Sequence, residues 1–258
     1  MYQLGLELFS TGGCGYHFPD TTIKKMDKTN RVLLVDYEKA FDKVTHEAVI
    51  EAFRLAFTGS DAWKMIESWI KGNKSRLCVN GKLSGEVPLM KGVRQGDPIS
   101  PLLYTLAGEL VNNSISKRMV GITLKFDPSI DTPSTPKWKN MDTVTKTIKL
   151  QAYADDTAIF CKNTIELNKV LDTLERAAVA IGTKVNRNKS VIISLDDNAS
   201  TADQIVGIPY LKDEPERYLG AFVGKNGIAP TLERRIPEME KMIKAFGQQG
   251  YIHSRSLA

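Results

Sequence analysis

The chain has 258 residues and a hydrophobic content of 42%, which is enough for one large domain with a packed core, or for one domain with an appendage. Its formal net charge of +5 is a mild basic excess, which is compatible with a nucleic-acid partner but supports one only weakly. No apolar run is long enough for a transmembrane helix, and three scattered cysteines (Cys14, Cys78 and Cys161) lack metal-ligand spacing, so we expect a soluble, intracellular protein with reduced thiols and no membrane partner.

The first strong pattern is the apolar run at residues 32–35, which predicts a strand buried on both faces of a sheet. Asp36 follows this run directly, so we expect its carboxylate at the rim of the sheet, where sites on sheets are usually built. A solvated strand end is the simpler alternative. Residues 1–30 contain a glycine-rich stretch and a small basic cluster, and neither indicates a function.

Two helices and a hairpin are predicted next. Thr45 is the expected N-cap of a helix with one apolar stripe, formed by Val49, Ile50, Phe53 and Phe57. A second helix is expected from Asp61 to Gly72, with a buried face formed by Met65, Ile66, Trp69 and Ile70. His46 has no neighbouring His or Cys and is expected to be a polar surface residue. The Asn80-Gly81 pair predicts a β-hairpin, which Arg76 and Lys82 make basic.

Residues 92–101 form an irregular loop that leads into a helix. Ser100 and Pro101 suit the N-cap and the first helical position. The predicted buried face of this helix consists of Leu102, Leu103, Leu106, Leu110 and Val111. Residues 121–126 then alternate as a strand. Residues 127–147 are rich in Pro, Thr, Ser and Lys and are interpreted as a long exposed insertion.

The second strong pattern is YADD at residues 153–156, where an apolar segment runs into two adjacent carboxylates and another apolar segment leads away. This pattern predicts two strands joined by a tight turn, with the acids at its tip. Asp is a common turn residue, so a structural turn is the simplest interpretation. Two neighbouring carboxylates, however, repel each other unless a cation neutralises them. With Asp36, they are the ligand set expected of a two-metal phosphoryl-transfer centre.

After this turn, Thr164 is the expected N-cap of a helix that ends at Gly182 and packs on the sheet. Residues 191–194 predict a further strand. Residues 231–246 are basic and amphipathic, and predict one more helix near the end of the chain.

Three of these stretches, in this order, resemble the successive palm motifs of reverse transcriptases, most closely those of non-LTR (LINE-type) retrotransposons: VDYEKAFD at 35–42, RQGDPISPLL at 94–103 and YADD at 153–156. KVNRNKS at 184–190 resembles the fourth palm motif, and Tyr218, Leu219 and Gly220 resemble the fifth, the primer grip. The resemblance implies an α+β, reverse-transcriptase-like palm over residues 31–225, with an antiparallel sheet and helices packed on one face. It leaves residues 1–30 without recognisable fingers and residues 226–258 as a partial thumb-like helix.

The resemblance also implies a ligand set. Asp36 and Asp155 would bridge two Mg²⁺ ions, for which Mn²⁺ is a candidate substitute. Asp156 would assist, and Tyr37 would offer its backbone carbonyl. Because the metals and the reacting groups meet here, these residues are the expected catalytic centre.

Further roles follow from the same resemblance. Phe41 would pack under the sugar of the incoming nucleotide, although an aromatic residue that anchors a loop on the core is the simpler alternative. Gln95 and Gly96, and more loosely Arg94, would contact the nucleotide and the template. Lys189 would protonate the leaving pyrophosphate, or equally serve as a plain phosphate contact.

The expected activity is RNA-directed DNA polymerisation, with an RNA template, a DNA primer and dNTPs as partners. Without recognisable fingers, the isolated chain is expected to extend a primer weakly. Two alternatives stay open: a palm remnant that binds RNA or protein without catalysis, and another two-metal enzyme such as a nucleotidyl cyclase. The expected location is intracellular, and nuclear if the chain acts as a retrotransposon enzyme. The sequence carries no signal for an oligomeric state.

Overall fold

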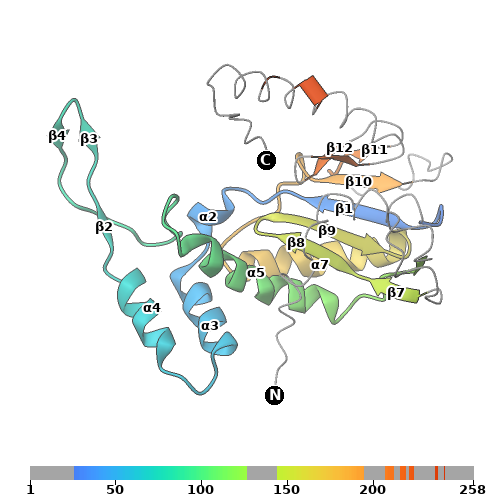
Figure 1. The fold of residues 1–258 in the computed structure, drawn as a ribbon, viewed down its shortest axis with the longest axis horizontal. Helices are drawn as coiled ribbons and strands as arrows, with labels where there is room; N and C mark the ends of the chain where they lie inside the picture. The colour runs from blue at the N-terminus through green and yellow to red at the C-terminus, as the bar shows by residue number, and fades with distance from the viewer. Residues whose placement is uncertain are drawn as a thin grey trace, which may run out of the picture.

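The computed structural model describes residues 26–126, 144–194, 207–211, 216–218, 221–223, 236–237 and 241. Its centre is a five-stranded sheet in the order β11-β10-β1-β9-β8 (Figure 1). These strands are β1 (Arg31–Val35), β8 (Leu150–Tyr153), β9 (Asp156–Cys161), β10 (Val191–Ser194) and β11 (Tyr210–Leu211). The pairs within the sheet are antiparallel except β10 with β11, which is parallel. The predicted α+β fold with an antiparallel-rich sheet is therefore confirmed.

The two faces of the sheet pack against different partners, because alternate residues of a strand point to opposite sides. Leu33 and Val35 of β1 belong to a core shared with the helices. Val32 and Leu34 point the other way and pack with β6 (Ile122–Phe126) and β7 (Val144–Ile148), which form a separate antiparallel pair. The prediction that residues 32–35 are buried on both faces is confirmed.

Two long helices, α5 (Ser100–Ser116) and α7 (Thr164–Ala180), lie against one side of the sheet, and α3 (His46–Ala56) packs on α5 and joins the same core (Figure 1). Helix α5 packs between the other two. The short α2 (Ala40–Lys43) follows β1, and α4 (Ala62–Ile70) packs on α3. Fully buried side chains such as Leu103, Leu167 and Leu174 fill the space between these helices and the sheet. Burial of this apolar face is what holds the layer of helices in place.

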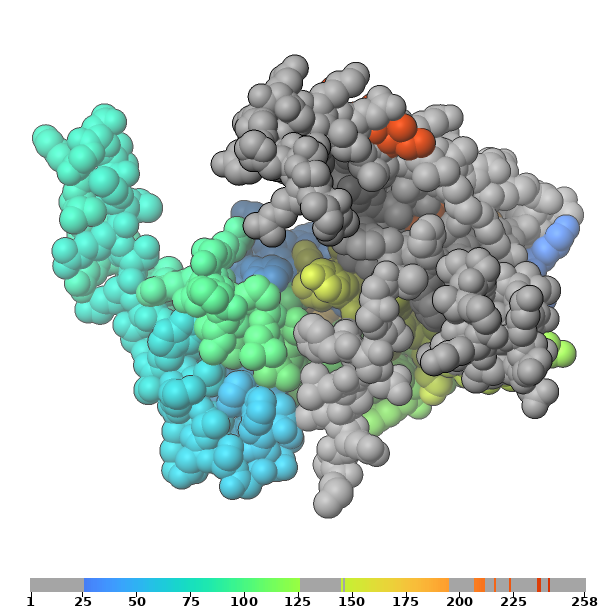
Figure 2. Space-filling model, viewed as in Figure 1, coloured from blue at the N-terminus to red at the C-terminus, as the bar shows by residue number. Residues whose placement is uncertain are grey.

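A ribbon of short strands projects away from the body beyond α4 (Figures 1 and 2). It contains β2 (Lys74–Ser75) paired with β5 (Val87–Pro88), and β3 (Cys78–Val79) paired with β4 (Lys82–Leu83). We call residues 74–88 the arm. Asn80 and Gly81 both have positive φ, as the Asn-Gly pattern predicts for a two-residue hairpin. A last pair, β12 (Glu216–Tyr218) and β13 (Ala221–Val223), follows the sheet.

Helix starts match the predictions in part. Thr45 caps α3 as predicted, and its side chain accepts a hydrogen bond from the Ala48 amide at 3.2 Å. The N-cap of α7 is Asn163 and not Thr164, because the Asn163 side chain reaches the Glu166 amide at 2.9 Å. The N-cap of α5 is Ile99, and Ser100, which was predicted for that place, is its first residue and is buried.

Several burial predictions are wrong. His46 is buried at the start of α3, and its Nε2 lies 3.2 Å from the Gly92 carbonyl oxygen, so the loop at Gly92 covers it. Three predicted core residues are exposed instead: Phe57 (46%), Met65 (62%) and Leu102 (48%). Phe57 is the C-cap that follows α3, and Met65 and Leu102 lie on helices whose buried stripe is narrower than the apolar pattern.

The interpretation of residues 127–147 as an exposed insertion is wrong at its end. Residues 144–147 are in β7, which pairs with β6 residue for residue from Ile122↔Ile148 to Phe126↔Val144. Residues 127–143 lie outside the described residues. Of the predicted helix at 231–246, the structure describes Ile236, Pro237 and Lys241, which are helical. Among the described helices, none has the length and hydrophobicity that a membrane span requires.

Candidate active site

Strand pairing brings the predicted carboxylates to one end of the central strands β1 and β9. We call this end of the strands, with Asp36, Asp155 and Asp156, the carboxylate edge of the sheet. The antiparallel register of β1 and β9 pairs Val35 with Thr157. Asp36 comes directly after Val35 and Asp156 directly before Thr157, so the two residues meet at the same edge. Asp155 lies in the turn that joins β8 to β9, next to Asp156. Residues that are far apart in the sequence are thus gathered by the pairing of the two central strands.

The turn between β8 and β9 contains only Ala154 and Asp155, as the YADD pattern predicts. The left-handed residue of this turn is Ala154, with φ of 54°, although Asp tolerates that region better than Ala. A positive φ at a residue with a Cβ costs conformational energy, so the surrounding pairs of β8 and β9 must hold the turn. Asp155 is exposed at its tip.

The three carboxylates interact electrostatically. The pKa of Asp156 is raised, first by partial burial of its carboxyl group and then by the negative charges of Asp155 and Asp36. A bound cation would relieve this repulsion. Among the described residues, no three acidic, His or Cys side chains converge as a ready-made metal cage. Mg²⁺ in phosphoryl-transfer sites is usually held by one or two carboxylates with substrate phosphates and water, and the residues present fit that kind of site.

The backbone of Asp36 is held by the loop at residues 184–190. The Asp36 amide donates to Ser190 Oγ at 3.1 Å, and its carbonyl accepts from the Asn186 amide at 2.8 Å. Ser190 is fully buried, and its Oγ donates in turn to the Asn186 carbonyl at 2.8 Å. Sequence reasoning missed this role of Ser190, because the partner of its hydroxyl is far away in the chain.

A second missed residue is Tyr104, on the buried face of α5. Its ring stacks on Phe41 with centroids 4.5 Å apart. Burial raises the pKa of the Tyr104 phenol, and electrostatic interactions with nearby Tyr37 and Asp155 raise it further. Burial also raises the pKa of the Tyr37 phenol, which is hydrogen-bonded with Thr157 of β9. Tyr37 is thus bonded to the strand that carries Asp156, Tyr104 lies close enough to Asp155 to interact with it, and Phe41 stacks on Tyr104.

The loop at residues 92–96 is pinned against α2. The Gly92 amide donates to Val44 O and the Val93 amide to Phe41 O, both at 2.8 Å. Gly92 has φ of 82°, and a Cβ there would lie 2.7 Å from the Asp42 carbonyl oxygen, so the close approach requires glycine. This contact fixes where the rest of the loop begins.

Three predicted nucleotide-binding residues lie at the exposed end of the same loop. Gln95 Nε2 donates to Asp42 Oδ1 at 2.9 Å, and an Arg94 guanidinium nitrogen lies 3.4 Å from the Lys74 carbonyl oxygen. Gly96 has φ of 88° and open space around it. The loop therefore connects the base of the arm to the segment that carries Phe41.

Lys189 is exposed in the loop that also holds Asp36, directly before Ser190. Tyr218 is in β12, whereas Leu219 and Gly220 lie outside the described residues. The structure thus brings Asp36, Tyr37, Asp155 and Asp156 together. Phe41 lies in α2, shortly after Asp36, and Lys189 lies in the loop that is hydrogen-bonded to the Asp36 backbone.

Comparison with known proteins identifies related sequences. Residues 5–223 match the sequence model of the family described as "Reverse transcriptase (RNA-dependent DNA polymerase)". The chain is 28% identical over 158 residues to the Transposon TX1 uncharacterized 149 kDa protein of Xenopus laevis, covering 61% of this chain and 11% of that protein. It is 26% identical over 239 residues to a retrovirus-related Pol polyprotein from the type-1 retrotransposable element R2 of Popillia japonica, covering 87% of this chain and 36% of that protein. The chain thus spans only about a third or less of these relatives.

Solved structures share the fold. Apo telomerase from Candida tropicalis superposes with a TM-score of 0.55 at 13% identity, covering 81% of this chain and 33% of that one. Telomerase from the same organism in complex with the TWJ fragment of telomeric RNA gives a TM-score of 0.52 at 14% identity, covering 79% of this chain and 30% of that one. At such low identity the likeness concerns the fold alone.

Proposed function

Because the chain belongs to the reverse transcriptase (RNA-dependent DNA polymerase) family, we propose that it carries the palm of an RNA-directed DNA polymerase and joins a dNTP to a DNA primer on an RNA template. In this reaction the primer 3′-hydroxyl attacks the α-phosphorus and pyrophosphate leaves. The observation that supports the proposal most directly is the register of β1 and β9, which puts Asp36 beside Asp156.

Asp36 and Asp155 are the proposed ligands of two Mg²⁺ ions, with Mn²⁺ as a substitute, while Asp156 assists and Tyr37 contributes its backbone carbonyl. Such ions, when bound, supply positive charge for the attacking and leaving oxygens. The raised pKa of Asp156 supports a cation at this edge, because repulsion among the carboxylates is part of its cause. Buried β1 and β9 then hold the carboxylates against movement during the reaction.

Phe41 is proposed to lie under the sugar of the incoming nucleotide and to exclude a 2′-hydroxyl. Its ring is half-buried and stacked on Tyr104, which supports a rigid steric wall. The same stacking anchors the segment after β1 to the core, and the two roles are compatible. Gln95, Gly96 and Arg94 are proposed to contact the template base and the nucleotide, and their exposure supports this.

Lys189 is proposed to donate a proton from its Nζ to the leaving pyrophosphate, or to bind the phosphate as a cation. Its exposure and its place in the loop that holds Asp36 support a position near the triphosphate. Tyr218, Leu219 and Gly220 are proposed to grip the primer. Template and primer would bind mainly through phosphate contacts and base pairing, so the protein need not read a sequence.

Single-nucleotide incorporation tests the proposal. The full 258-residue chain, in excess over an RNA template with a DNA primer, is given Mg²⁺ and one dNTP. We expect wild-type incorporation and a loss of more than about a hundredfold in Asp155→Asn, because residues that merely support a metal ligand already cost about 10- to 100-fold. Asp61→Asn, an exposed carboxylate at the start of α4, is the matched control and is expected to leave the rate unchanged.

Two further measurements separate the outcomes. Circular dichroism checks that the variants are folded, and Mn²⁺ binding followed by electron paramagnetic resonance checks the metal site directly. Equal incorporation by wild type and Asp155→Asn would contradict the proposal. A folded chain that binds the template and primer but incorporates nothing would favour the non-catalytic, RNA-binding alternative.

A further inference from the structure

A groove with a volume of about 980 Å³ lies between α3, α5 and α7, and none of its lining residues is a predicted site residue. Helix α5 supplies its floor with residues three and four apart on one helical face: Leu106, Glu109, Leu110, Asn113, Ser114 and Lys117. From Leu106 to Lys117 this face is about 16 Å long at a rise of 1.5 Å per residue. It therefore matches a helix of about three turns.

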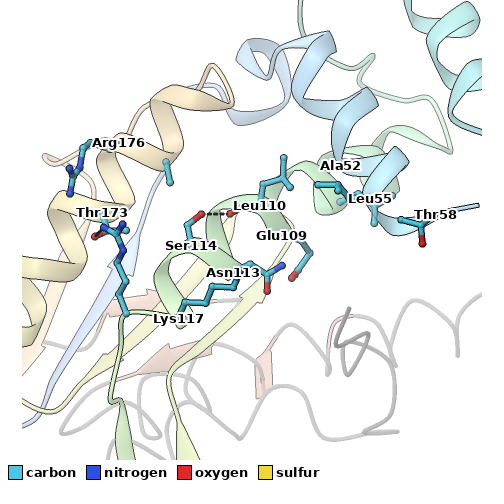
Figure 3. Close-up of a pocket in the computed structure, with 13 residues that line it drawn as sticks. Ala52, Leu55, Thr58, Glu109, Leu110, Asn113, Ser114, Lys117, Thr173 and Arg176 are labelled. Carbon is cyan, nitrogen blue, oxygen red and sulfur yellow. Dashed lines mark hydrogen bonds between the residues drawn. The ribbon is translucent and has the colours of Figure 1, made fainter. Parts of the chain in front are cut away.

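The two walls of the groove differ in charge. Ala52, Leu55 and Thr58 form an uncharged wall on the side of α3, as Figure 3 shows. The opposite side carries Arg176 of α7, which Figure 3 labels, and two more cations, Lys117 and Arg118, follow the last residue of α5 at the end of the groove. Leu55 is 44% exposed and contributes an apolar surface next to the floor of the groove.

The cations of the charged wall still have N–H groups available to bind a partner. Arg118 donates to the neutral Thr173 hydroxyl at 3.3 Å, and Lys117 makes no side-chain hydrogen bond or ion pair among the described residues. Arg176 pairs with Asp172 on the outer surface of α7, where such a pair contributes little. Each therefore has N–H donors to offer to an added carboxylate.

Glu109 limits which side chains an occupant of the groove can place over the floor. Burial raises the pKa of its carboxyl group, and its charge lies on the floor of the groove. A second carboxylate placed above it would be repelled. An occupant must therefore be apolar or uncharged over the floor and acidic on the flank that faces α7.

We propose that this groove binds an amphipathic helix of a protein partner, with its apolar stripe over Leu55 and Leu110 and acidic residues against Lys117, Arg118 and Arg176. The arrangement is that of helix-in-groove recognition, in which residues at helical spacing fill an apolar groove. The charged wall selects acidic flanks and rejects basic ones. This surface is independent of the polymerase proposal, since it uses no residue of the carboxylate edge.

Labelled peptides of about four helical turns test the proposal by fluorescence anisotropy with the full chain. The first peptide has a leucine stripe with a glutamate flank, the second has the same composition in scrambled order, and the third has lysine in place of each glutamate. We expect saturable binding of the first peptide with a Kd of about 10 μM. The scrambled peptide should show no saturation, and the lysine peptide should bind at least about tenfold more weakly.

Matched variants connect the binding to the groove. Leu55→Gln should weaken the glutamate peptide about tenfold, because it removes apolar contact without adding charge. Met65→Gln changes a more exposed apolar residue of α4 outside the groove and should leave the affinity unchanged. Lys117→Glu should weaken the glutamate peptide and strengthen the lysine peptide. Unfolding of the variant cannot produce that reversal.

Several results would overturn the proposal. They are equal binding of the glutamate and lysine peptides, unchanged affinity in Leu55→Gln, or no saturation by the glutamate peptide. Sedimentation tests a different occupant: concentration-dependent self-association that Leu55→Gln abolishes would assign the groove to a second copy of the chain instead.

Discussion

The edge of the sheet that carries Asp36 and the arm at residues 74–88 are built in opposite ways. Each residue of β1 is buried, and β1 pairs along its length with β9 on one side and with β10 on the other. The arm consists of strands of two residues, and all residues of these strands are exposed. Leu77, Val79 and Leu83 are each at least 64% exposed.

Different forces therefore position the two regions. The carboxylates stand on strands fixed by burial on both faces, which is worth several kcal/mol per large side chain. The arm is held by its Asn80-Gly81 turn and by exposed ion pairs from Glu86 to Lys74 and Arg76, which contribute little. The comparison teaches that the carboxylate edge and the arm should respond independently to substitution.

The largest expected effect is a core substitution that would break the carboxylate edge. Ile159 in the centre of β9 is fully buried, so Ile159→Ala should lower the free energy of unfolding by about 2–5 kcal/mol through lost contacts and a cavity. Leu83→Ala on the arm removes a side chain that is 65% exposed and should change the free energy of unfolding by less than about 0.5 kcal/mol. Urea denaturation measures both. A comparable loss in Leu83→Ala would show that the arm is part of the stabilised fold.

A smaller effect is expected at the hydrogen bond that holds Asp36. Ser190→Ala leaves the Asp36 amide without its acceptor and should lower the free energy of unfolding by about 1–2 kcal/mol. Ser68→Ala is the matched control, because its exposed Oγ donates only to the Met65 carbonyl within α4, and it should cost less than about 0.5 kcal/mol.

The same variant tests whether Ser190 positions the carboxylate edge. With Asp36 less firmly held, Ser190→Ala should weaken Mn²⁺ binding, and Ser190→Thr, which keeps the hydroxyl, should restore much of it. A loss of stability with unchanged Mn²⁺ affinity would mean that Ser190 serves the fold alone.

The sequence predicts the position of the carboxylates in the sheet well, because its signals are local and match the final environment. Four apolar residues before Asp36 indicate a strand that must be buried, and YADD indicates a turn with acids at its tip. The structure adds the antiparallel pairing of β1 with β9, which brings the two patterns together. These are patterns of period and turn chemistry, which act over a few residues.

Long-range partners could not be predicted in the same way. His46 is covered by Gly92, Ser190 bonds to Asp36, and Tyr104 stacks on Phe41, and each contact depends on a distant segment. A single His, Ser or Tyr shows no sequence periodicity from which its contact partner could be predicted. Residues 144–147 were misjudged for a related reason: their Thr and Lys side chains look like a loop, but β6 provides a pairing edge.

The smallest expected effect comes from removing the charge of Asp156 at the carboxylate edge. Partial burial and the charges of Asp155 and Asp36 disfavour the ionised form of the Asp156 carboxyl group. Asp156→Asn should therefore raise the free energy of unfolding of the metal-free protein. The gain should be only about 0.5 kcal/mol, because water screens a half-exposed group.

The pH dependence of this gain follows from the direction of the pKa shift. Because the pKa of Asp156 is raised in the folded protein, the wild type carries the penalty above that raised pKa and loses it as the pH falls through it towards the ordinary value of 3.8. The gain from Asp156→Asn should therefore be full at neutral pH and vanish in acid. Saturating Mg²⁺ should shrink it at neutral pH, since a cation that binds the folded wild type more tightly than the variant stabilises the wild type more. Thermal unfolding with EDTA and with Mg²⁺ across this range measures both effects, and a gain that persists in acid would mean that charge repulsion is not its cause.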